Sequence, residues 1–172
     1  FMTLTLEEAA KYYREHYAVA LSVREIVDGV NAMVEKIYRT KVTSKPGVMD
    51  YLRLLKENGV KMCVATATDR YLVEETLQRL GMLHCFSEIF TCAEIGYGKD
   101  KPIIYRKALE HLGTVKEETY VFEDALFALK TARADGFPTV GVYDRHEIRQ
   151  DELKSFADYY IMDFADAILK TI

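Results

Sequence analysis

The sequence lacks three features that mark large classes of function: an excess of positive charge, a long apolar run and a cysteine-rich pattern. Its 23 Lys and Arg stand against 27 Asp and Glu, so no global positive field exists to hold nucleic acid or an anionic membrane. No apolar run reaches the roughly 18–20 residues of a membrane span, and residues 1–5 do not resemble the start of a signal peptide. We therefore expect no nucleic-acid and no membrane partner, and any phosphate must bind at a local site.

The three cysteines, Cys63, Cys85 and Cys92, form no C-x-x-C pair. Cys63 and Cys92 lie in apolar, strand-like runs, which favours their interpretation as small buried thiols. We expect a protein of the reducing cytoplasm.

The chain falls into two regions of different pattern. Residues 1–42 are helical and strand-free: Thr5-Leu6-Glu7-Glu8 and Ser22-Val23-Arg24-Glu25 are capping boxes, each followed by apolar residues at helical spacing. Thr43-Ser44-Lys45-Pro46-Gly47 is the one linker-like stretch. We predict a boundary there, with a helix pair at 1–42 and a larger domain at 43–172.

Beyond this boundary, helical segments alternate with short apolar strands. The periodicity predicts helices near 48–58, 71–80, 102–112 and 125–134, and strands near 61–66, 88–92, 119–122, 139–142 and 159–161. Helices alternating with continuous apolar strands indicate an α/β fold, with a parallel sheet covered on both faces.

In open parallel sheets, ligands bind outside the carboxyl ends of the strands, and the first strand ends in Thr66-Ala67-Thr68. Hydroxyl groups and backbone N–H groups just before a helix can donate to an anion. Thr66 or Thr68 can equally serve only to cap that helix. Taken alone, this strand end favours neither interpretation.

The loop after the second strand, residues 96–102, carries Lys99 and Lys101 between glycines and Pro102. A lysine in such a loop suits a fixed positive charge. For either lysine in isolation, a solvated surface position is the favoured alternative. The glycines match neither of the common phosphate-binding fingerprints.

The third strand is followed directly by two carboxylates, Glu123 and Asp124. Both would be partly desolvated there and would repel one another, which costs free energy unless a cation compensates. Magnesium, which takes one or two protein carboxylates together with phosphate and water oxygens, suits this pair. The alternative is that the two acids only favour the N-terminus of the next helix.

The order and spacing of these segments resemble a known family. Thr66 after a strand, the loop Gly98-Lys99-Asp100-Lys101-Pro102-Ile103-Ile104-Tyr105, and Phe122-Glu123-Asp124 before a helix resemble the second, third and fourth motifs of the haloacid dehalogenase superfamily. The stretch from Val121 to Phe137 resembles its phosphatase and β-phosphoglucomutase-like branch, and the helical start resembles the end of that branch's cap. Ile103 departs from the branch, which commonly has aspartate there, and Asp100-Lys101 replaces a usual Pro-x pair, which makes Lys101 a weaker rival of Lys99.

The resemblance implies a Rossmann-like parallel sheet with a partial helical cap. It also implies a magnesium-dependent phosphatase that acts on a small, sugar-phosphate-like metabolite through an aspartyl-phosphate intermediate. Thr66 and the Ala67 amide would bind the transferring phosphoryl group, and Lys99 would neutralise its charge and orient the nucleophile. Asp124 would hold Mg2+, with Glu123 as a second ligand or as its partner.

The first motif of the family, a D-x-D-G-T pattern that supplies the nucleophilic aspartate, does not occur in the 172 residues. In the family it ends the first, central strand, so we predict that this strand is missing from the segment and that the segment alone is inactive. Losing a central strand would leave backbone donors and acceptors unpaired, so we expect the strand to exist in the native protein.

Other functions compatible with the sequence are a sugar phosphomutase of the same fold and a non-catalytic phosphate-binding or regulatory module. A receiver-type signalling domain fits less well, because its acidic pair should precede the threonine and the lysine. Four polar side chains of the helical region are candidate substrate contacts, although each is better explained as a solvated helix side chain: Arg14, His16, Tyr17 and Arg39.

Overall fold

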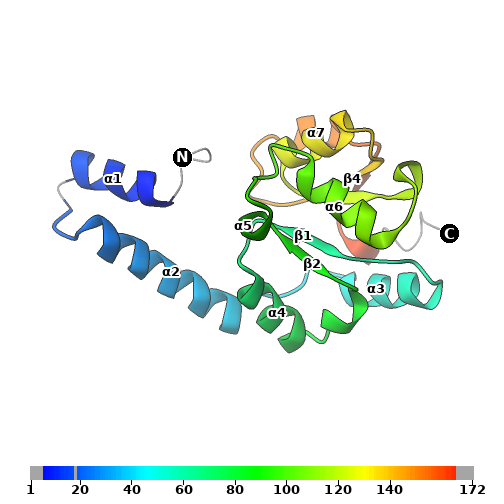
Figure 1. Ribbon diagram of the computed structural model, residues 1–172, viewed down its shortest axis with the longest axis horizontal. Helices are drawn as coiled ribbons and strands as arrows, with labels where there is room; N and C mark the ends of the chain where they lie inside the picture. Colours follow the sequence, from blue (N-terminus) through cyan, green and yellow to red (C-terminus); the bar gives the residue numbers. More distant parts are fainter. Residues whose placement is uncertain (1–5, 18, 166–172) are drawn as a thin grey trace. The chain divides into compact units, whose positions relative to one another are not determined.

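The computed structural model describes residues 6–17 and 19–165. The chain divides into two compact units, Phe1–Val42 and Thr43–Ile172, which we describe separately (Figure 1). The predicted alternation of helices and strands, and with it the α/β fold class, is confirmed. None of the helices in the described ranges is long and apolar enough to cross a membrane.

The first unit contains two helices, α1 (Leu6–His16) and α2 (Val23–Thr40). The predicted capping box at Ser22 is confirmed, because Ser22 Oγ accepts from Glu25 N at 3.2 Å and Glu25 Oε2 accepts from Ser22 N at 2.8 Å. The box predicted at Thr5 begins outside the described residues. Among the candidate substrate contacts of the helical region, His16 stacks on Tyr12 of the same helix.

The second unit begins with α3 (Val48–Glu57), β1 (Val64–Thr66), α4 (Arg70–Arg79), a 3₁₀ turn η1 (Leu83–Cys85) and β2 (Ile89–Thr91). It continues with α5 (Cys92–Ile95), α6 (Ile103–Leu112), the turn η2 (Lys116–Glu118), β3 (Val121–Glu123), α7 (Leu126–Ala134), β4 (Thr139–Val142), α8 (Gln150–Phe156) and β5 (Tyr159–Ile161). The short helices α5 and α8 were not predicted. The strand expected at 61–66 begins only at Val64, because the parallel ladder with β2 begins there.

All strands of the described residues pair in parallel, and they form two separate ladders, the arrangement expected if the central strand is missing from the segment. One ladder is β1-β2 and the other is β3-β4-β5. Thr66 is paired with Thr91 in the first, and Glu123 with Gly141 in the second. The break falls between β1 and β3, and helix α6 joins the two ladders through a cluster that packs Ile104 and Tyr105 with residues of both.

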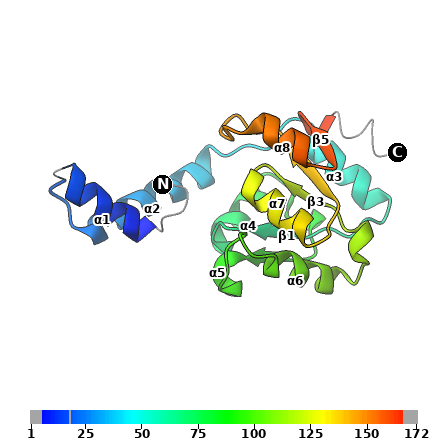
Figure 2. The same cartoon turned by 90° about the horizontal axis from the view of Figure 1, so that it is seen from above.

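Strand β4 is covered by helices on both faces. Val140 and Val142 pack on Tyr51 of α3. Gly141 points to the opposite face, where a Cβ atom would lie 2.7 Å from Leu153 Cδ2 of α8. The alternation along one strand therefore separates two helical layers, and Gly141 allows the close approach of α8. Figure 2 shows α8 and β5, in orange and red, near α7.

Candidate active site

The first component of the site is a buried cluster around Glu123 at the end of β3. Lys99 Nζ lies 2.5 Å from Glu123 Oε1, and Tyr105 Oη donates to the same oxygen at 2.8 Å. The Glu123 side chain is 5% exposed and that of Lys99 is 16% exposed. Lys99 is therefore a positive charge held inside the protein and not a solvated surface lysine. Tyr105, the last residue of the loop motif, had no role in the sequence analysis.

Burial dominates the electrostatics of this cluster. It raises the pKa of Glu123, while the Lys99 ammonium and the Tyr105 hydroxyl act in the opposite direction. Burial and the neighbouring Glu123 carboxylate also raise the pKa of Tyr105. Holding an ammonium at this strand end therefore costs desolvation free energy.

The second component is Asp124, which lies in different surroundings from Glu123. Its side chain is 48% exposed, and Asp124 Oδ2 lies 4.0 Å from Lys45 Nζ. Lys45 is closer to a third carboxylate, with Nζ at 2.7 Å from Asp144 Oδ2. The bond from Lys45 lowers the pKa of Asp144, and burial partly opposes this effect.

Sequence reasoning missed both Lys45 and Asp144. Lys45 lies in the stretch that we interpreted only as a linker. Asp144 follows β4 by two residues, so the rule that ligands bind at the carboxyl ends of parallel strands would have selected it, had we applied the rule to the strand at 139–142.

The third component is the turn after β1. Thr66 Oγ1 accepts a hydrogen bond from Thr68 N at 3.1 Å. Asp69, and neither Thr66 nor Thr68, occupies the N-cap position of α4. Thr66 thus ends β1 and Ala67 begins the turn that leads to α4, a place where side-chain and backbone groups can donate to an anion.

The surroundings of Cys92 show that these components lie near one another. It follows Thr91, the partner of Thr66 in the first ladder. Burial raises the pKa of the Cys92 thiol, the Lys99 ammonium lowers it and the Glu123 carboxylate raises it further. The carboxyl ends of β2 and β3 are thus close enough to interact electrostatically, and register brings the end of β1 beside that of β2.

Lys101, the weaker candidate in the loop, is exposed, and its Nζ lies 4.6 Å from the centre of the Tyr97 ring. It makes a cation–π contact, whereas Lys99 reaches the buried carboxylate. Of the two lysines, only Lys99 contacts Glu123.

The donor set is compatible with a magnesium ion of the kind that the resemblance implies. Lys99 and Tyr105 both bond to Oε1 of Glu123, which leaves Oε2 as a possible metal ligand. Asp124 is half-exposed beside the Lys45 ammonium, so a positive charge already lies close to where a metal cation would lie. Two carboxylates are enough for Mg2+, which keeps waters and substrate oxygens as its other ligands. Within residues 6–17 and 19–165, no group of three or more His, Cys, Asp or Glu side chains forms a metal cage.

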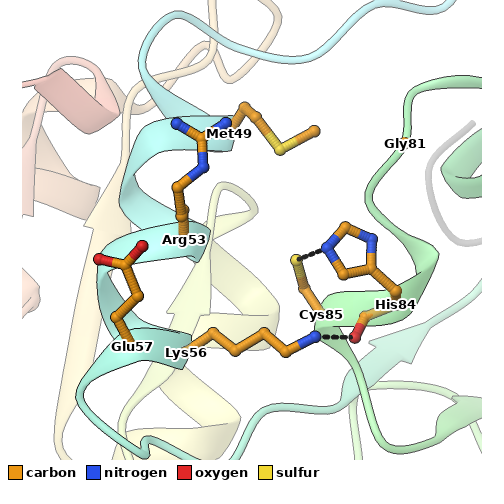
Figure 3. A pocket seen from close by; sticks show the side chains of 7 residues that line it. All are labelled: Met49, Arg53, Lys56, Glu57, Gly81, His84 and Cys85. Atoms are coloured by element: carbon orange, nitrogen blue, oxygen red, sulfur yellow. Dashed lines mark hydrogen bonds between the residues drawn. The ribbon is translucent and has the colours of Figure 1, made fainter.

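A cavity of ≈ 380 Å³ lies elsewhere, between α3 and η1 (Figure 3). Lys56 Nζ donates there to His84 O at 2.8 Å, and Cys85 Sγ lies 3.6 Å from His84 Nε2. The lining residues are Met49, Arg53, Lys56, Glu57, Gly81, His84 and Cys85. None of the predicted site residues is among them, so this cavity is separate from the candidate active site.

Comparison with known proteins now identifies the family. The sequence model of the haloacid dehalogenase-like hydrolases matches residues 1–142. The chain belongs to this family. The resemblance found in the sequence is thereby confirmed.

Among the curated relatives, one is named as a phosphatase and another is named only as protein CbbY. The chain is 27% identical over 134 residues to the phosphorylated carbohydrates phosphatase of Thermotoga maritima, covering 74% of the chain and 62% of that protein. It is 33% identical over 114 residues to protein CbbY of Cereibacter sphaeroides, covering 62% of the chain and 49% of that protein. The chain thus spans less than two thirds of the length of these two relatives.

Solved structures show the same fold. A putative β-phosphoglucomutase from Thermotoga maritima superposes with a TM-score of 0.83 at 22% identity, covering 99% of the chain and 81% of that structure. CbbY from Rhodobacter sphaeroides, solved in complex with phosphate, superposes with a TM-score of 0.78 at 22% identity, covering 96% of the chain and 76% of that structure.

Proposed function

We propose that the protein is a magnesium-dependent phosphatase of a small phosphorylated metabolite, resembling a sugar phosphate, and that it works through an aspartyl-phosphate intermediate. The observation that carries this proposal is the buried ion pair between Lys99 and Glu123 at the carboxyl end of β3. Phosphoryl transfer requires positioning and charge stabilisation more than covalent help from the protein, and Lys99 is a positioned charge. Membership of a hydrolase family and a relative named as a carbohydrate-phosphate phosphatase support the same activity.

In this proposal, the Thr66 hydroxyl and the Ala67 N–H donate to the phosphoryl oxygens. Lys99 neutralises their charge, and one ammonium about 4 Å from a phosphate oxygen contributes about 4 kcal/mol at an effective dielectric constant near 20. Asp124 and Oε2 of Glu123 would hold Mg2+, which supplies further neutralisation of the phosphoryl oxygens when bound.

The nucleophile of the proposed reaction is an aspartate outside the 172 residues. We propose that it ends a strand that lies between β1 and β3, where the two parallel ladders are separate. The strand would pair with the inner edges of both ladders and bring its carboxyl end beside Thr66 and Lys99. We also propose a cytoplasmic location, with Cys63, Cys85 and Cys92 as free thiols.

The decisive experiment measures hydrolysis of p-nitrophenyl phosphate with Mg2+ by a chain that also carries the D-x-D segment. We expect Lys99→Met and Asp124→Asn each to reduce kcat by at least about 100-fold, the scale of losing one electrostatic stabiliser. Lys116→Met, which removes a lysine paired with Asp135 instead, should leave kcat unchanged. Full activity of the Lys99→Met variant would refute the proposal.

The same preparation separates the remaining candidate functions. Release of phosphate from glucose 1-phosphate supports the phosphatase, and conversion to the 6-phosphate supports a phosphomutase, the activity for which one structural neighbour is named. Binding of Mg2+ and phosphate without turnover would favour a non-catalytic module.

A further inference from the structure

The Asp124 carboxylate shares one lysine with a second carboxylate. Lys45 Nζ lies 2.7 Å from Asp144 Oδ2 and 4.0 Å from Asp124 Oδ2. It also donates to the carbonyl oxygen of Tyr143 at 2.8 Å. The ammonium is therefore held by the loop after β4 and reaches Asp124 only at the outer limit of an ion pair.

The backbone turn at Pro46-Gly47 fixes the position of Lys45. Phe164 N donates to Pro46 O at 3.0 Å. Gly47 has a φ of 76°, and a Cβ atom there would lie 2.4 Å from Ala165 N. Any other residue would be strained and would collide with the backbone. Lys45 therefore directly precedes a turn whose backbone position is fixed.

Asp144 is fixed just as firmly. His146 N donates to Asp144 Oδ1 at 2.9 Å, and Gln150 Nε2 donates to Asp144 O at 3.0 Å. Glu147 Oε2 accepts from Leu126 N at 3.0 Å, which ties this loop to the start of α7, two residues after Asp124. These hydrogen bonds fix the loop that carries Asp144 and so hold Asp144 near Asp124.

We propose that Lys45 is a tethered competitor of the divalent ion for Asp124, and that Asp144 is the positioning residue that draws Lys45 away. This inference rests on the proposed function, in which Asp124 holds the ion. An ammonium and a metal ion repel each other when both lie against one carboxylate. The close pair with Asp144 keeps Lys45 beside Asp124 but not in contact with it, and so sets the metal affinity of the site.

The test is the dissociation constant of Mg2+, measured by isothermal titration calorimetry without substrate. Asp144→Asn should weaken binding about tenfold, because Lys45 then turns to Asp124. Lys45→Met should tighten binding about tenfold, because the competing charge is gone and the Asp144 charge remains. The double variant should bind within about threefold of Lys45→Met, since Asp144 acts on the ion through Lys45 and its effect is lost once Lys45 is gone.

Lys116→Met is the matched control. Lys116 Nζ lies 3.1 Å from Asp135 Oδ2, and its side chain is 30% exposed, against 33% for Lys45. It belongs to η2, before β3, whereas Asp124 follows that strand. An unchanged Mg2+ affinity is expected. A change equal to that of Lys45→Met would show a net-charge effect and would overturn the inference.

Asp124→Asn separates failure of the inference from failure of the proposed function. If this variant binds Mg2+ as tightly as the unmodified protein, Asp124 is not a metal ligand and the metal assignment in the proposed function fails. If it abolishes binding while Lys45→Met and Asp144→Asn leave the dissociation constant unchanged, only the competition by Lys45 is refuted. Circular dichroism and the Tm of each variant establish that it is folded.

Discussion

Glu123 and Asp124 are adjacent in the chain, yet they lie in opposite surroundings. Glu123 is 5% exposed and contacts a lysine at 2.5 Å, whereas Asp124 is 48% exposed and its nearest lysine lies at 4.0 Å. Glu123 is the last residue of β3, whereas Asp124 lies in the turn between β3 and α7. One step along the chain therefore turns a carboxylate from the interior to the surface.

This difference gives the two carboxylates different roles in our proposal. Breaking a buried ion pair leaves an uncompensated charge and is costly, whereas an exposed pair contributes little and is easily exchanged. Glu123 therefore suits a fixed frame that holds Lys99 through Oε1 and offers Oε2 to the ion, and the exposed Asp124 suits the reversible binding of that ion. Three changes test this comparison.

Removing the buried lysine should have the largest effect. Lys99→Met leaves the Glu123 carboxylate buried without its cation, so we expect the free energy of unfolding to fall by about 3 kcal/mol in urea denaturation. Lys107→Met, which breaks an exposed pair with Glu110, should change it by less than about 1 kcal/mol. Adding Glu123→Gln to Lys99→Met should restore much of the loss, and its failure to do so would contradict a charge-based explanation.

Removing the tyrosine hydroxyl should have an intermediate effect. Tyr105→Phe deletes the bond to Glu123 Oε1, with an expected loss of about 1.5 kcal/mol, the range for a bond to a charged acceptor. The same bond lowers the pKa of Glu123, so the pKa should rise further in the variant, as measured by carbon-13 NMR titration. Tyr159→Phe, at an exposed position, serves as the control, and equal effects of both variants would exclude a specific role for Tyr105.

The pH dependence of stability should have opposite signs for the buried Glu123 and the partly exposed Asp144. The pKa of Glu123 is raised above 4.5 on folding, so its contribution is full below pH 4.5 and is lost as pH rises through the folded pKa. The pKa of Asp144 is lowered below 3.8, so its contribution is present above pH 3.8 and is lost as pH falls through the folded pKa.

These signs define a calorimetric experiment on Tm against pH, carried out without metal. Glu123→Gln should flatten the decline in Tm above pH 4.5, and Asp144→Asn should flatten the decline below pH 3.8. The free energy involved in either variant should be about 1 kcal/mol or less, which makes this the smallest of the three predicted effects. Identical profiles for the two variants would contradict the proposed difference in environment.

Much of the fold could be predicted from the sequence because it depends on local patterns. The strands at 139–142 and 159–161 were predicted with the observed bounds, and the Ser22 capping box was predicted from four residues. The short helix α8 was missed, because seven residues with only Leu153 buried give too little periodicity. Pro102, which we expected as the first residue of α6, instead occupies the N-cap position.

The candidate site was predictable in part. The strand-end rule selected Thr66, Lys99, Glu123 and Asp124, because strand order and motif spacing are properties of the chain itself. It could not select Tyr105, whose importance comes from a hydroxyl 2.8 Å from Glu123. The gap between the two ladders was predicted by the family resemblance and not by this rule, because the missing D-x-D motif ends the central strand.

The sequence by itself determined the order of helices and strands, the motifs of the haloacid dehalogenase-like family and the net charge, all of which are read along the chain. Only the tertiary structure decided which carboxylate is buried and which lysine faces it. Lys45 reaches Asp144 across 99 positions of sequence, and Lys99 reaches Glu123 across 24. Coulomb energy and desolvation depend on distance and burial in space, and no local pattern of residues specifies either.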